Sequence, residues 1–171
     1  MLRTWICIIL FILFLIEGAL TPWLPLKWNE GLHITPHFTF IIILYTCFYV
    51  QRSFAIIIAF LIGFFYDIIY SNQLFGLYAF CLGFIVYFIS YMIKRSYLGF
   101  FTFTLVATLS LFLLDSMIYG IYYLFKLTEQ SYIWVIAHQV LPSLFVNVLF
   151  SMMLYLPFRS LVVHISFKQK G

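Results

Sequence analysis

Charged residues are scarce in this sequence. Lys, Arg, Asp and Glu together make up 8% of its 171 residues, against roughly 25% in an ordinary soluble domain. Apolar residues make up 65%, yet a soluble domain of about 150 residues leaves roughly 30% of its chain surface facing solvent. A soluble chain of this length could not bury so much apolar surface. The composition therefore excludes a soluble domain and predicts an integral membrane protein with the lipid bilayer as its solvent.

Clustered reactive groups are also missing. Three cysteines, Cys7, Cys47 and Cys81, fall in different apolar runs without CxxC spacing, so we expect them to behave as small apolar residues. The four histidines are spread along the chain, and the GxSxG and HExxH motifs are absent. We therefore predict no catalytic residue, no metal site and no cofactor, and hence no enzyme. The basic residues are scattered singly, which argues against a nucleic-acid partner.

Six long apolar runs take up most of the chain. They lie near 5–20, 38–50, 54–70, 77–93, 97–125 and 132–158, and a spanning helix needs about 20 apolar residues. The runs do not alternate as the strands of a membrane barrel would. We expect an all-α fold, a polytopic membrane helix bundle of about six transmembrane helices in a single transmembrane domain over residues 1–171. The second run is short, and reaches span length only if its helix starts near Thr35 or the bilayer thins around it.

Positive charge predicts the orientation of these spans, because Lys and Arg near span ends are retained in the cytoplasm. If the amino terminus lies inside, the inner ends collect Arg3, Arg52, Lys94, Arg95, Arg159, Lys168 and Lys170, and the outer ends hold only Lys27 and Lys126. Both termini are therefore predicted to be cytoplasmic. The first run resembles a signal peptide in outline but lacks an A-x-A-like cleavage site, so we expect a retained span. Residues 21–37, with Trp23 and Trp28, are expected to form an interfacial loop.

Three acidic residues lie inside predicted spans: Glu17, Asp67 and Asp115. An ionised carboxylate near the centre of a spanning helix costs roughly 2.5–3.5 kcal/mol on insertion scales. We expect Glu17, near a span end, to reach water by snorkelling. For Asp67 and Asp115 two alternatives stay open: each pairs with nearby tyrosines, or both face a polar pocket that opens outward beside Pro142. The candidate pocket residues are Asp67, Asp115, His138, Gln139 and Asn147.

Small residues recur every four positions in the third run, at Ala55, Ala59 and Gly63, and Ala79 with Gly83 repeats this spacing in the fourth. Such stripes let helix backbones approach closely in a bilayer. The stripe predicts packing inside one bundle, with a docking face for a partner span as the second interpretation.

A family resemblance rests on the stretch FAIIIAFLIGFFYDIIYSNQLFGLYAFCLGFIVYFI. It resembles the signature of MreD, the rod-shape-determining membrane proteins of bacteria, in which a Gly-Phe step leads to an Asp one turn before a short loop and a Gly opens the next helix. Those residues are Gly63, Phe64, Asp67 and Gly76 here. The last run, QVLPSLFVNVLFSMMLYL, is similar to the closing helix of that family, with Pro142 and Asn147 in the expected places.

The resemblance implies a non-enzymatic component of the machinery that elongates the bacterial cell wall, located in the cytoplasmic membrane. The implied partner is an MreC-like single-span protein, and through it MreB, RodA and a penicillin-binding protein. The family's fold resembles the substrate-binding component of energy-coupling-factor vitamin transporters, so a vitamin-binding subunit is the alternative function. Those subunits carry an Ala-xxx-Ala stripe on the first span, whereas the stripe here falls on the third.

Overall fold

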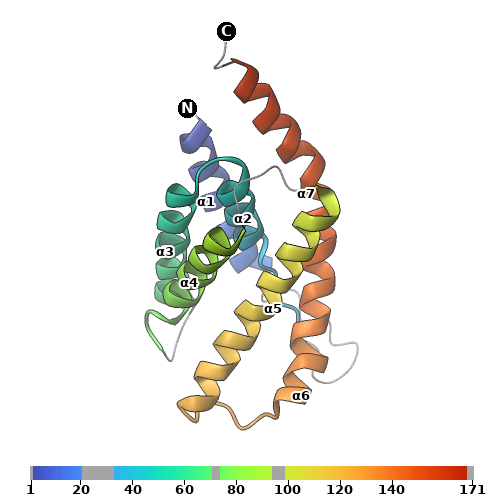
Figure 1. Ribbon diagram of the computed structural model, residues 1–171. Coiled ribbons are helices and arrows are strands. Elements are labelled where there is room, and N and C mark those ends of the chain that lie inside the picture. Colours follow the sequence, from blue (N-terminus) through green and yellow to red (C-terminus); the bar gives the residue numbers. More distant parts are fainter. Residues whose placement is uncertain (1, 21–32, 71–73, 94–98, 169–171) are drawn as a thin grey trace.

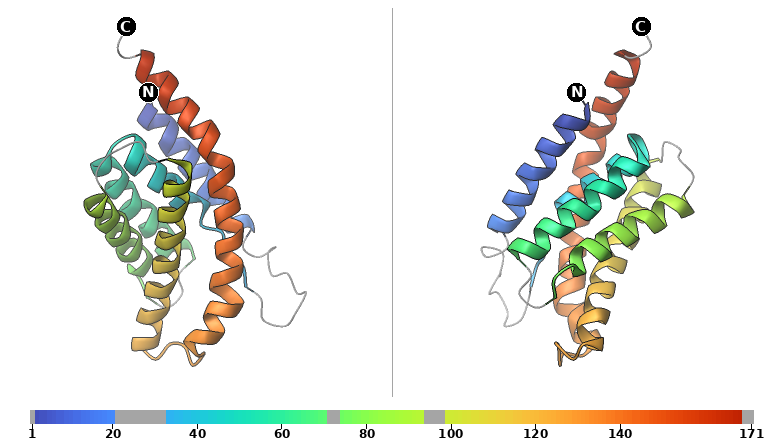
Figure 2. Two further views of the ribbon diagram at one scale, coloured as in Figure 1. Left: turned by 45° about the vertical axis from the view of Figure 1, so that its right-hand side comes forward. Right: turned by 90° about the vertical axis from the view of Figure 1, so that its left-hand side faces the viewer.

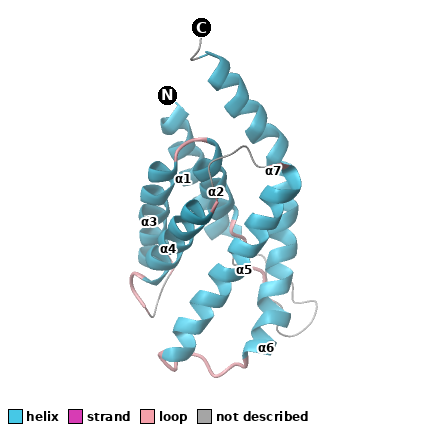
Figure 3. Ribbon diagram, viewed as in Figure 1, coloured by secondary structure: helices cyan, strands magenta, loops and turns pink. Residues whose placement is uncertain are grey.

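The computed structural model describes residues 2–20, 33–70, 74–93 and 99–168, with the side chains of the last helix described as far as Tyr155. All regular structure in this part of the chain is helical (Figure 3). The elements are α1 (Leu2–Leu20), α2 (Phe38–Tyr49), α3 (Arg52–Ile69), α4 (Leu77–Met92), α5 (Phe100–Leu124), α6 (Tyr132–Val135), the π-helical η1 (Ile136–Val140) and α7 (Leu141–Lys168) (Figure 1). The last three follow one another directly and form one rod. The predicted runs therefore match the helices, with ends that differ by at most three residues, except that α7 runs to Lys168.

Four of these helices are long and apolar enough to cross a membrane. They cover Arg3–Leu20, Arg52–Ile69, Phe100–Leu124 and Tyr132–Tyr155, and the shorter α2 and α4 are also apolar. Large apolar side chains point outward from them, as along α5 at Phe101, Leu105, Leu109 and Leu113. Exposed apolar surface on this scale requires a nonaqueous neighbour.

The short helix α2 lies in the middle of the bundle. It contacts α1, α3, α4 and α7, and every residue after Phe38 is buried. Figure 2 shows the other helices around it. Helix α2 begins at Phe38, where the second apolar run was predicted to begin. Residues 33–37 are not helical, so the helix does not gain span length by starting near Thr35, and a locally thinner bilayer stays the other alternative.

Helices α3 and α4 form the most closely packed pair. Ala55, Ala59 and Gly63 of α3 are all buried within the chain. A Cβ atom added at Gly63 would lie 2.5 Å from the Cα atom of Ala79 on α4, so the two backbones touch at that point. The stripe therefore packs inside this bundle, and its three residues offer no exposed surface for a partner span.

Two arginine side chains form hydrogen bonds between helix ends at one end of the bundle. Arg3 donates a hydrogen bond to the side chain of Gln51, just before α3. Arg52 donates to the carbonyl of Ile93, just after α4, at 2.9 Å. Helix α1 begins and α7 ends at this same end (Figures 1 and 2). Other residues of the orientation argument lie outside the described residues or their described side chains: Lys27, Lys94, Arg95, Arg159, Lys168 and Lys170. Trp23 and Trp28 of the predicted interfacial loop also lie outside the described residues.

Candidate functional site: a polar pocket at the end of the bundle

The extended segment 33–37 lies along the last helix, and that contact begins with Pro142. Proline has no N–H group, so it leaves the carbonyl four residues earlier, that of His138, without its helical donor. The π-helical turn η1 lies directly before α7 at this place, so the rod continues. The free carbonyl of His138 instead accepts the backbone N–H of His33 at 3.0 Å. The backbone ladder is therefore interrupted at Pro142 without ending the helix.

Two side chains of α7 bind the rest of the extended segment. The hydroxyl of Ser143 accepts the N–H of Thr35 at 2.9 Å. Asn147 accepts the N–H of His37 at 2.8 Å through Oδ1 and donates to the carbonyl of Thr35 at 3.1 Å. Nonhelical backbone at membrane depth requires protein partners of this kind. Ser143 and Asn147 therefore hold the irregular segment that leads into α2.

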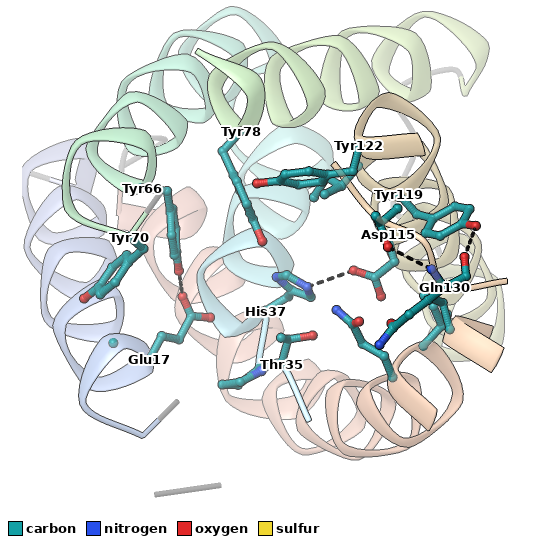
Figure 4. Close-up of a pocket in the computed structure, with 17 residues that line it drawn as sticks. Glu17, Thr35, His37, Tyr66, Tyr70, Tyr78, Asp115, Tyr119, Tyr122 and Gln130 are labelled. Carbon is teal, nitrogen blue, oxygen red and sulfur yellow. Dashed lines mark hydrogen bonds and ion pairs between the residues drawn. The ribbon is translucent and has the colours of Figure 1, made fainter. Parts of the chain in front are cut away.

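A pocket of about 510 Å³ opens where α1 and α3 end and α4 begins. Polar and aromatic groups dominate its wall. The lining residues are Glu17, Gly18, Thr35, Pro36, His37, Tyr66, Tyr70, Tyr78, Asp115, Ile118, Tyr119, Tyr122, Thr128, Gln130, Val135, Gln139 and Val140. Figure 4 shows Glu17 with Tyr66 and Tyr70 on one side, Asp115 with Tyr119 and Gln130 on the other, and Thr35 and His37 between them.

The carboxylate of Glu17 is an anchor between three elements. It accepts the N–H of Thr39 at 2.8 Å and the hydroxyl of Thr39 at 2.6 Å, and the hydroxyl of Tyr66 also donates to it. These bonds join α1 to the start of α2 and to α3. Only 1% of Glu17 is exposed. The expectation that Glu17 snorkels to water is therefore wrong, since its bonding partners lie inside the bundle.

Asp115 on α5 forms a pair with His37. Its Oδ1 lies 3.1 Å from Nε2 of His37, and each side chain is 8% exposed. The pair connects α5 to the extended segment before α2.

Asp67 lies outside the pocket wall and caps α4. Its two carboxylate oxygens accept the N–H groups of Tyr78 and Ala79 at 2.9 and 3.0 Å. These donors belong to the first turn of α4, which has no helical partners for them. The residue before the helix, Gly76, has φ +89° and no side chain that could cap. The carboxylate of Asp67, on α3, therefore acts as the N-cap of α4 and links the two helices of the α3–α4 hairpin.

Replacing this cap should destabilise the hairpin. We expect Asp67→Ala to lower the free energy of unfolding by about 2 kcal/mol, because two buried N–H groups lose their acceptor. Ser131→Ala is the matched control: Ser131 caps α6 through one exposed bond of 3.4 Å, and its loss should cost about 0.5 kcal/mol. Thermal unfolding of the purified protein in detergent measures both, and equal losses would contradict the role of Asp67.

The five candidate pocket residues therefore divide. Asp115 and Gln139 line the pocket, whereas Asp67, His138 and Asn147 are not part of its wall. The ring of His138 stacks on that of Trp134, with ring centroids 4.6 Å apart. The backbone carbonyl of His138 accepts the N–H of His33 in the extended segment. Three of the five thus act in backbone contacts that sequence spacing did not distinguish from a pocket role.

The sequence reasoning treated the tyrosines as partners of the two aspartates and residues 33–37 as part of a loop. It did not place the tyrosines in the pocket wall, and it did not foresee that residues 33–37 bind the last helix. Five of the 13 tyrosines line the pocket, and they come from α3, from the residue that follows it, and from α4 and α5. A signal for the segment was present: Thr35 stands directly before Pro36, and the residue before a proline is disfavoured in helical backbone. Among the described residues no group of three or more His, Cys, Asp or Glu side chains could hold a metal ion.

Comparison with known proteins decides the family. A family profile described as rod shape-determining protein MreD matches residues 1–165. The chain belongs to the MreD family. The rod shape-determining protein MreD of Bacillus subtilis (strain 168) is 26% identical over 126 residues, which cover 74% of this chain and 73% of that protein. No solved structure matches significantly. The region matched by the MreD profile contains every residue that lines the pocket.

Proposed function

We propose that this MreD-family chain is a non-enzymatic membrane scaffold of the bacterial cell-wall elongation machinery, with a role in maintaining rod shape. The match to the MreD profile over residues 1–165 carries the proposal. The geometry supports it, because the carboxylates of Glu17, Asp67 and Asp115 each bind groups from another element. Such bonds hold the helices in fixed relative positions, as a scaffold requires.

The scaffold is proposed as one domain, residues 1–171, that crosses the cytoplasmic membrane with all six helical rods and keeps both termini in the cytoplasm. Two observations support this topology. Arg3 and Arg52 lie at the end of the bundle where α1 begins, and basic residues favour the cytoplasmic side. The pocket then opens on the outer side.

Reporter fusions test the orientation. A fluorescent protein fused after Gly171 should fluoresce, because it folds in the cytoplasm, whereas alkaline phosphatase at the same place should be inactive. Fusion of both reporters after Glu129, in the exposed turn between α5 and α6, should give the reverse pattern. Active phosphatase at the carboxyl terminus would contradict the proposed topology.

The proposed partner is the single span of an MreC-like protein, and through it MreB, RodA and a penicillin-binding protein. Apolar side chains that face outward are available for such a contact on several helices, among them Ile12 of α1, Ile57 of α3 and Leu105 of α5. In a bilayer, helices meet through close packing rather than through the hydrophobic effect. One of these faces should therefore be covered by the partner and the others by lipid.

Photo-crosslinking in native membranes tests partner binding. A photoreactive amino acid placed at Ile12, Ile57 or Leu105 should give a covalent product with an MreC-like protein from at least one position, identified by mass spectrometry. Leu111, which is fully buried in α5, is the matched control and should give no product. Absence of a partner product from every outward position on all helices would contradict the scaffold proposal.

The pocket itself favours a second candidate, a solute-binding subunit with a fold like that of energy-coupling-factor transporters. Its volume of about 510 Å³ falls in the range of small-molecule sites. Copurification separates the two candidates: an ATPase module and a tightly held solute favour transport, and an MreC-like partner favours the scaffold.

A further inference from the structure

We propose that the polar pocket of this protein binds a small organic cation, with its ammonium group placed near the carboxylate of Asp115 and against the rings of the surrounding tyrosines. This inference is independent of the scaffold proposal. It assigns a ligand class to a cavity that the scaffold role leaves unused.

The charges of the pocket wall define the sign of the ligand. The wall contains two carboxylates, from Glu17 and Asp115, and one imidazole, from His37, and none of the 17 lining residues is Lys or Arg. The carboxyl oxygens of Glu17 accept three donors, and Asp115 is paired with His37. An anionic ligand would meet these acceptor oxygens without a lysine or arginine to bind it, whereas the positive charge of a cation would be attracted to them.

The tyrosines define the chemical class of the cation. Five of them line the pocket: Tyr66, Tyr70, Tyr78, Tyr119 and Tyr122. Aromatic rings attract ammonium groups through their quadrupole, and rings arranged around a cavity are the usual recognition mode for alkylated ammonium. The rings of Tyr66 and Tyr78 stand nearly parallel, with centroids 5.4 Å apart. Figure 4 shows rings from α3, α4 and α5 on several sides of the same space.

A metal ion fits this wall less well than an organic cation does. Metal sites need three or more ligands close together, and no such group of His, Cys, Asp and Glu side chains occurs in the described residues. The two carboxylates instead belong to opposite sides of the pocket (Figure 4). One carboxylate with aromatic neighbours matches an ion of low charge density and an apolar outer surface.

The groups that would contact the cation are held in place before it binds. Asp115 is fixed by His37 at 3.1 Å, and Thr35 is fixed by Ser143 at 3.1 Å. The hydroxyl of Tyr119 donates to the carbonyl of Gln130 at 2.7 Å. Side chains that are already fixed lose little conformational entropy when a ligand binds.

Three probes of similar shape test the inference: tetramethylammonium, tert-butanol and pivalate, which are cationic, neutral and anionic. Calorimetric titration into the purified full-length protein in detergent measures each affinity. We expect tetramethylammonium to bind at least about tenfold more tightly than the other two. Equal binding of the three probes, or no binding of tetramethylammonium, would overturn the inference.

Variants locate the site. Asp115→Asn should weaken tetramethylammonium binding about tenfold, and Glu129→Gln, which removes a charge from an exposed position outside the wall, should leave it unchanged. If Asp115→Asn does not fold, a second pair decides: Tyr122→Leu should weaken binding about fivefold and Tyr122→Phe should retain it, because only the ring matters. Unchanged affinity in Tyr122→Leu would overturn the inference.

Crosslinking to a partner is a separate measurement from ligand binding. A failed pocket proposal can therefore be distinguished from a failed scaffold proposal.

Discussion

Gly63→Leu should separate α3 from α4 and remove most of the folded protein. A Cβ atom at position 63 would lie 2.5 Å from Cα and 2.7 Å from N of Ala79. These are backbone atoms, so no side-chain rotation relieves the overlap, and a leucine adds three further carbon atoms to it. Overpacking of this kind costs about 3 kcal/mol. Size-exclusion profiles of the detergent-solubilised protein should show a loss of the monodisperse peak.

Gly120→Leu is the matched control for this substitution. Gly120 lies in α5, and apart from its chain neighbours and the backbone of its own helix no atom lies within 4 Å of a Cβ atom built there. The same change of residue should therefore alter the free energy of unfolding by less than about 1 kcal/mol, the size of the helix-propensity difference. Similar losses in both variants would show that the α3–α4 contact is not the cause.

Glu17→Ala should be the second strongly destabilising change. It leaves the N–H of Thr39, the hydroxyl of Thr39 and the hydroxyl of Tyr66 without their common acceptor. Each buried donor that loses its partner costs about 1–3 kcal/mol. The two hydroxyls can rotate toward other acceptors, whereas the N–H cannot, so we expect a total loss of roughly 3 kcal/mol. Thermal unfolding in detergent measures this loss.

Two controls separate the anchor from a general effect of charge. Glu129→Ala removes an exposed carboxylate and should change stability by less than about 0.5 kcal/mol. Glu17→Gln retains the size of the side chain and one acceptor, so its loss should be intermediate. If Glu17→Ala unfolds at the same temperature as Glu129→Ala, the three hydrogen bonds contribute no net stability.

The helices were predictable because lipid solvation acts on each segment separately. A run such as 97–125 is apolar along its whole length, and α5 occupies Phe100–Leu124 inside it. The position of Gly76 before α4 followed from the MreD-like signature, and it is the residue with positive φ there. The start of α2 at Phe38 also agrees with the predicted run 38–50. The contact of residues 33–37 with the last helix was not predictable in this way, because an apolar run does not reveal where the neighbouring backbone finds its partners.

The pocket was only partly predictable, because polar residues inside a bundle have two possible uses. Asp67 and Asp115 have the same chemistry and lie in similar apolar surroundings in the sequence. The structure uses Asp67 to cap α4, and it turns Asp115 toward His37 and the pocket. The choice depends on which helix end lies beside each carboxylate, and helix packing alone decides that.

By itself the sequence determined that this chain is a helical membrane protein, where its long helices lie and which family it belongs to. These properties follow from the local content of each segment and from the short MreD-like motifs. Only the tertiary structure decided that Glu17 is buried, that Asn147 supports the extended segment, and that five tyrosines share one cavity. Each of these depends on contacts between residues far apart in the chain, and their geometry is fixed only when the helices pack.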